Sequence, residues 1–129
     1  MFIRNWLLLG LTCFVSSAFA VDKEPYTPER LAELQAQGAL VLVDVFADWC
    51  PTCARQQAVL DRYVEERPEV DLHVLEVDFD EDRQSVRDLR APRQSTLLLF
   101  RGEQQYWYSV AETREEVIFE AIDRAAAAR

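Results

Sequence analysis

The chain has 129 residues, a hydrophobic fraction of 50% and a formal net charge of −9. A chain of this length has room for one hydrophobic core, so we expect a single folded domain. The excess of acidic residues argues against a nucleic-acid partner, because phosphate backbones are bound by basic surfaces.

Residues 1–20 have the pattern of a secretory signal peptide. Arg4 is their only charge, an apolar run follows it, and the segment ends in small side chains at Ala20. We therefore expect cleavage after Ala20, export to the periplasm and a mature domain over residues 21–129. The alternative is an uncleaved membrane anchor, but a span needs about 20 apolar residues, and Ser and Thr dilute the second half of this segment.

The rest of the chain alternates between helical and strand patterns. Residues 21–26 are polar and predict no regular element, whereas Thr27 and Pro28 are typical of a helix start. Thr113 and Glu116 have the spacing of a capping box, which predicts a last helix to about Ala127. Between these two helices the pattern predicts a strand over 40–46, a helix over 51–66, a strand over 72–77, a helix over 82–89, and strands over 96–100 and 105–110. This order predicts an α/β fold with a central mixed β-sheet flanked by helices.

Cys50 and Cys53 follow the strand over 40–46 and open the next helix, and functional groups gather at the carboxyl ends of strands in such sheets. A structural disulfide is a weak alternative, because so short a loop restrains the unfolded chain little. A zinc site needs a full set of Cys or His ligands, and only His73 accompanies the pair after cleavage. We expect no metal or cofactor in one chain; two chains sharing an iron–sulfur cluster is a minor alternative.

The position of the pair indicates thiol–disulfide chemistry. A thiolate is the attacking species, and the unpaired N–H groups and dipole of a helix N-terminus favour an anion. Cys50, at the helix tip, is predicted to attack a substrate disulfide, and Cys53, about one turn on, to attack Cys50 and release the product.

Asp44 interrupts the apolar strand over 40–46. A carboxyl group buried there has a raised pKa, and we interpret it as the acceptor of the proton that Cys53 loses. The alternative is an aspartate that faces water at the strand's end. For Trp49 we consider an apolar lid beside Cys50 and plain core packing, which are compatible with each other.

The segment Trp49-Cys50-Pro51-Thr52-Cys53, with Asp44 upstream and the strand over 96–100 downstream, resembles the thioredoxin family. The resemblance covers about residues 30–127. It implies the thioredoxin fold, with Cys50 as nucleophile, Cys53 as resolving cysteine and Asp44 as the family's buried acid.

Ser95 departs from the family pattern, because family members carry a cis-proline there, opposite the cysteine pair. A cis bond before a non-proline residue costs about 3 kcal/mol, so we expect the Gln94–Ser95 bond to be trans, or else strained. The groove that holds substrate backbone is expected to be lined by Trp49, Pro51, Thr52, Ser95 and Thr96.

These observations predict an exported thiol–disulfide oxidoreductase that exchanges dithiols and disulfides with protein substrates, with reduction favoured. The segment 46–50 also resembles the terminal domains of periplasmic electron-transfer reductases. The expected partners are protein thiols and disulfides and an upstream electron donor such as a membrane reductase. We expect no nucleic-acid partner, and we expect the protein to be a monomer. The competing hypothesis is a thioredoxin-fold adaptor whose cysteine pair is idle.

Overall fold

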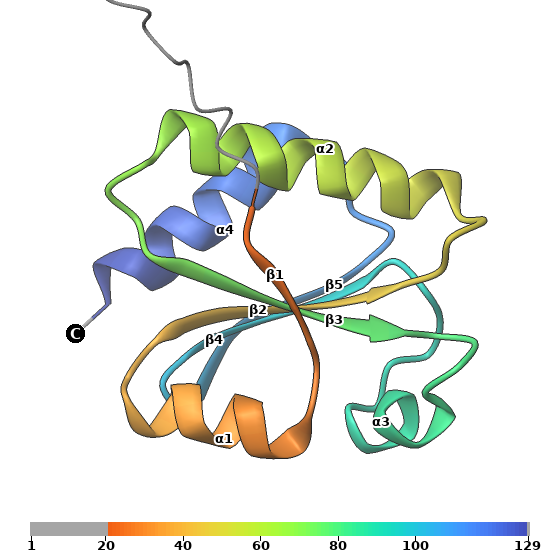
Figure 1. The fold of residues 1–129 in the computed structure, drawn as a ribbon. Helices are drawn as coiled ribbons and strands as arrows, with labels where there is room; N and C mark the ends of the chain where they lie inside the picture. The colour runs from red at the N-terminus through yellow and green to blue at the C-terminus, as the bar shows by residue number, and fades with distance from the viewer. Residues whose placement is uncertain (1–20, 129) are drawn as a thin grey trace, which may run out of the picture.

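The computed structural model describes residues 21–128. Figure 1 shows the chain as one sheet between helices. Its elements are β1 (Lys23–Pro25), α1 (Pro28–Ala36), β2 (Leu40–Phe46), α2 (Pro51–Glu66), β3 (Leu72–Asp78), α3 (Arg83–Asp88), β4 (Thr96–Arg101), β5 (Gln104–Val110) and α4 (Glu115–Ala127).

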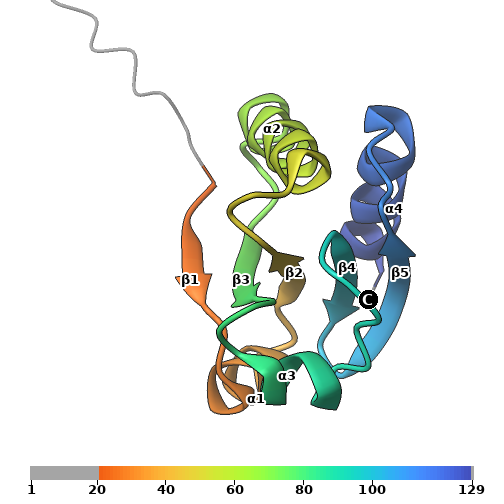
Figure 2. The same cartoon turned by 90° about the vertical axis from the view of Figure 1, so that its right-hand side faces the viewer.

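The sheet has the strand order β1-β3-β2-β4-β5. The first three of these strands are parallel, whereas β4 and β5 are antiparallel to their neighbours. Helices α2 and α4 cover one face, and α1 and α3 lie on the other (Figure 1 and Figure 2). The predicted α/β fold with a mixed central sheet is therefore confirmed.

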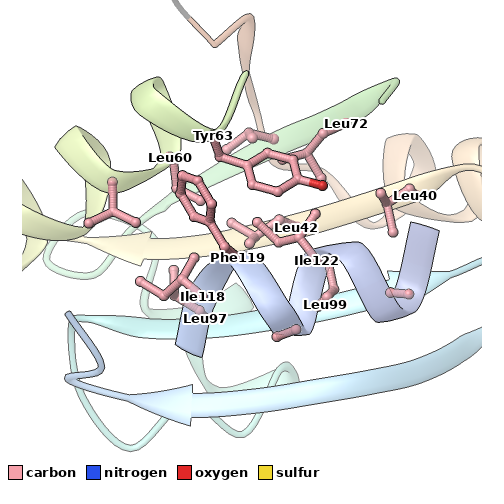
Figure 3. Close-up of a cluster of buried hydrophobic side chains, with 14 of the residues drawn as sticks. Leu40, Leu42, Leu60, Tyr63, Leu72, Leu97, Leu99, Ile118, Phe119 and Ile122 are labelled. Carbon is pink, nitrogen blue, oxygen red and sulfur yellow. The ribbon is translucent and has the colours of Figure 1, made fainter. Parts of the chain in front are cut away.

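The central strand β2 is buried on both faces, as its nearly continuous apolar sequence predicts. Leu40 and Leu42 point towards α2 and α4, whereas Val41, Val43 and Val45 belong to the cluster on the side of α1 and α3. Figure 3 shows the first cluster, in which side chains of α2 and α4 meet those of the sheet. Burial of each large apolar side chain stabilises the fold by about 1.5–3 kcal/mol, so β2 is fixed from two sides.

Tyr63 links α2 to α4. Its ring meets that of Phe119 edge to face, with centroids 5.0 Å apart, and its hydroxyl donates a hydrogen bond of 2.8 Å to Asp123 Oδ1. The edge-to-face geometry is a favoured one for aromatic pairs. This contact and the apolar cluster hold α2 against the sheet, and with it the cysteines at its first turn.

The start of α1 is as predicted. Thr27 caps the helix, since the Arg30 N–H donates a 3.0 Å hydrogen bond to its hydroxyl oxygen, and Pro28 takes the first helical position.

Two local predictions are wrong. Residues 21–26, expected to be irregular, include β1, which pairs with β3. The cap of α4 is Arg114 rather than Thr113, and the Glu112 carboxylate accepts hydrogen bonds from both backbone N–H groups. The N–H groups of Thr113 and Arg114 lie ahead of the first intrahelical hydrogen bond, and the Glu112 side chain supplies their acceptor.

Within residues 21–128, no helix combines the length and apolar character required to cross a lipid bilayer. Residues 1–20, where we predict a signal peptide, lie outside the described part of the chain.

Candidate active site

Cys50 is the N-cap residue of α2. Its backbone is extended, with φ −90° and ψ 109°, and its N–H donates a 3.1 Å hydrogen bond to Ala47 O in the turn that leaves β2. Its sulfur accepts a 3.1 Å hydrogen bond from the Cys53 N–H. Pro51 occupies the first helical turn, where its missing N–H has no partner to lose. The sequence therefore places a sulfur atom where the helix has unpaired donors.

Both cysteines are free thiols and both are buried, with Cys50 5% and Cys53 2% exposed. Burial raises the pKa of Cys50, but hydrogen bonds from Cys53, Ser95 and the backbone of Thr52 outweigh it, so the pKa lies below that of an ordinary cysteine. For Cys53, burial and the hydrogen bond with Cys50 raise the pKa. One thiol of the pair is therefore easier to ionise than the other, which is the asymmetry that disulfide exchange needs.

Ser95 lies against the sulfurs of both cysteines. Its Oγ is 3.2 Å from Cys50 Sγ and 3.1 Å from Cys53 Sγ. Among residues 21–128 every peptide bond is trans, including Gln94–Ser95, and Ser95 has a φ of 64°. The first of the two expected outcomes, a trans bond, is therefore confirmed. The backbone of Ser95 lies in the strained left-handed region, which the sequence did not predict.

The other predicted groove residues are only partly at the surface. Trp49 is 63% exposed, and its Nε1 donates a 2.7 Å hydrogen bond to Asp80 Oδ2. Pro51 is exposed and Thr52 half-buried. Thr96 is fully buried, and its hydroxyl donates to Arg93 O at 2.6 Å, so its side chain is not at the surface. The core-packing interpretation of Trp49 is wrong.

Asp44 is fully buried, and neither carboxylate oxygen has a hydrogen-bond partner in the described part of the chain. The interpretation of Asp44 as a water-facing residue is therefore wrong. The pKa of Asp44 is raised to about 7, mainly by burial and in addition by the negative charge of Glu76. Lys23 and Gln57 lower this pKa. A buried acid without a partner is costly, and such groups are concentrated at functional sites.

A cavity of about 440 Å³ lies between the cysteine pair and the neighbours of Asp44. Cys50 and Cys53 line one part of it, and Gln57, Lys23 and Glu76, whose side chains influence Asp44, line another. Lys23 and Glu76 form an ion pair of 3.7 Å. The two sulfurs and the immediate neighbours of Asp44 therefore share one solvent-accessible space.

Gln56 is a site residue that the sequence reasoning missed. It is fully buried on α2, and its Nε2 donates to Ser95 O at 3.1 Å and to Glu112 O at 2.9 Å. The sequence could have indicated this residue, because Gln56 lies one helical turn after Cys53 and one before Leu60, on the buried face of the helix. A polar residue on such a face needs a partner.

Groups of three or more Cys, His, Asp or Glu that could bind a metal ion are absent from residues 21–128.

The thioredoxin family model matches residues 25–124. The chain is 30% identical to a thioredoxin of Chlamydia trachomatis over 96 residues, which cover 74% of this chain and 91% of that protein. It is 36% identical over 78 residues to the thiol:disulfide interchange protein DsbD of a Pseudomonas species, covering 56% of this chain but 13% of that protein.

Solved structures agree with these matches. The protein Trxlp of Edwardsiella tarda superposes with a TM-score of 0.72 and 38% identity, over 78% of this chain and 98% of that one. Mitochondrial thioredoxin 3 of Saccharomyces cerevisiae has the same fold, with a TM-score of 0.66 and 18% identity, over 81% of this chain and 94% of that one. With its Cys50-x-x-Cys53 motif at the start of α2, the chain therefore belongs to the thioredoxin family of thiol–disulfide oxidoreductases.

Proposed function

We propose that this protein reduces disulfides of protein substrates in the periplasm, with Cys50 as nucleophile and Cys53 as resolving cysteine. The observation that carries the proposal is the position of Cys50 Sγ, which accepts a hydrogen bond from the Cys53 N–H at the tip of α2. Donors that point at this sulfur favour its anion, and the anion is the attacking species.

The reaction proceeds in two exchanges. The Cys50 thiolate attacks a substrate disulfide, a mixed disulfide forms, and one substrate sulfur leaves as a thiolate. Cys53 then loses its proton and attacks Cys50 Sγ, which releases the second substrate sulfur and leaves a Cys50–Cys53 disulfide. A donor of electrons must then reduce this disulfide, since the chain itself holds no other thiol among residues 21–128.

Asp44 is the group we assign to accept the proton of Cys53. Its pKa of about 7 allows it to take up and release a proton near neutral pH. The cavity that adjoins Cys53 is also lined by Gln57 and Glu76, which act on Asp44, so solvent in this space extends from Cys53 to the neighbours of Asp44.

The proposed direction of exchange, reduction, and the proposed partners are based on similarity to other proteins. The chain is similar over 78 residues to part of a protein named for thiol:disulfide interchange. We assign to this chain a membrane reductase as electron donor, and export through residues 1–20.

The cysteine roles predict different outcomes for two serine variants. Wild type is expected to catalyse reduction of a protein disulfide such as that of insulin by dithiothreitol. Cys50→Ser reduces the rate to that of dithiothreitol alone, because no thiolate remains to attack. Cys53→Ser accumulates a mixed disulfide through Cys50, detectable by mass spectrometry, because the resolving step is lost. Equal behaviour of all three proteins would favour the adaptor hypothesis.

The buried carboxyl group predicts a pH-dependent gain in stability for Asp44→Asn. The pKa of Asp44 is 3.8 in the unfolded chain and about 7 when folded, so the folded state binds this proton more tightly. Wild type therefore loses stability as pH rises from about 4 to about 7, up to roughly 4 kcal/mol, whereas the amide variant does not.

Urea unfolding of both proteins across this pH range measures the difference. The control is Asp71→Asn, whose side chain is 93% exposed. A constant difference between Asp44→Asn and wild type from pH 4 to 8 would contradict the raised pKa.

The direction of exchange predicts a low reduction potential. Equilibration of the purified protein with glutathione or dithiothreitol buffers is expected to give a value near about −270 mV, as for reducing thioredoxins. A value near about −120 mV would instead identify an oxidant.

Export predicts that the mature chain begins at Val21. Mass spectrometry of the protein from a periplasmic extract of an expressing bacterium is expected to give the mass of residues 21–129. Recovery of the full-length chain in the membrane fraction would favour the uncleaved anchor.

A further inference from the structure

Ser95 occupies an unusual position for a hydroxyl group. Its Oγ contacts both cysteine sulfurs, at 3.2 Å and 3.1 Å, and its side chain is completely buried. A buried hydroxyl can donate one hydrogen bond and accept others. The contacts that Ser95 Oγ makes are both with the atoms that react.

The surroundings hold this hydroxyl in place at an energetic cost. Ser95 has a φ of 64°, and a non-glycine residue in the left-handed region is strained. Three hydrogen bonds fix its backbone: its N–H donates to Val45 O at 2.7 Å, and its carbonyl accepts from Ala111 N at 2.9 Å and from Gln56 Nε2 at 3.1 Å. Strain of this kind persists only where the neighbouring structure determines the conformation.

We propose that Ser95 is a catalytic residue whose hydroxyl donates its hydrogen bond to whichever of the two sulfurs is the anion, first Cys50 and then Cys53. The proposal rests on the roles assigned above to the two cysteines. It gives the hydroxyl a task that a proline in this position cannot perform, because proline has no side-chain donor.

In the reduced protein one of the two sulfurs is protonated and the other is a thiolate. Cys50 is the thiolate and accepts from the Ser95 O–H, while the Cys53 S–H donates to Ser95 Oγ. When Cys50 attacks, its bond to a substrate sulfur forms, the substrate disulfide breaks, and the other substrate sulfur leaves with the electron pair. Cys50 Sγ is then neutral and no longer needs the donor.

The second exchange uses the same hydroxyl. Cys53 gives its proton to Asp44, the base assigned above. The Ser95 O–H then rotates to donate a hydrogen bond to the Cys53 thiolate. Cys53 Sγ then bonds to Cys50 Sγ, the mixed disulfide breaks, and the second substrate sulfur leaves as a thiolate. Two electrons have passed from the cysteine pair to the substrate, and the hydroxyl keeps its own proton.

The effect of Ser95 on both thiols supports this exchange. Burial is the largest influence and raises the pKa of each cysteine, and the hydroxyl of Ser95 lowers both. The charged groups lining the cavity beside the sulfurs are Lys23, Asp48 and Glu76, and none of them changes in the variants below.

The test is thiolate titration by absorbance at about 240 nm in reduced proteins. Ser95→Ala is expected to raise the pKa of Cys50 by about 1, which is a tenfold lower thiolate fraction below that pKa. In a Cys50→Ser background, Ser95→Ala is expected to raise the pKa of Cys53 as well. A serine that only supports the backbone would leave both titrations unchanged, and that result would overturn the proposal.

Two further variants serve as controls for this test. Ser95→Gly removes the hydroxyl while relieving the left-handed strain, so the same rise in both pKa values is expected if Ser95→Ala folds poorly. Ser109→Ala removes a buried hydroxyl without a hydrogen-bond partner, and is expected to titrate as wild type. Titration needs no turnover, so a wild type inactive in the insulin assay would count against the proposed function and not against the hydrogen bond.

Discussion

The junction between the carboxyl end of β2 and the first turn of α2 determines the properties of the site. At this point the helix has N–H groups without intrahelical partners, and Cys50 places its sulfur where it accepts one of them. The junction is rigid because β2 is buried on both faces and α2 is anchored by Tyr63. Packing far from the cysteines thus fixes the direction in which the donors point.

A second loop completes the environment of the sulfurs, and it is held from α2 itself. The amide of Gln56 bridges Ser95 O and Glu112 O, two carbonyls from segments on either side of the β4–β5 hairpin. The helix that carries the cysteines therefore also positions the hydroxyl opposite them. This coupling keeps a strained serine within reach of both sulfurs, where family members have a proline.

Local signals in the sequence predicted the elements whose determinants are local. The cap at Thr27 and the continuous apolar run of β2 are short-range patterns, and both have the expected structure. Strand β1 has no such pattern, because its three residues are polar or proline and their strand conformation comes from pairing with β3. The contact of Ser95 with the sulfurs depends on a backbone conformation that residue types alone do not specify. Its place opposite the cysteines came from the resemblance.

Strand β1 also accounts for part of the chemistry of Asp44. The register of β2 and β3 pairs Asp44 with Glu76, so two carboxyl groups lie side by side at the sheet. Strand β1 brings Lys23 to Glu76, and this positive charge lowers the pKa of Asp44 against the combined effect of burial and Glu76. Without it, Asp44 would stay protonated to a higher pH. The short strand that the sequence did not reveal therefore contributes a charge that makes the buried acid easier to ionise.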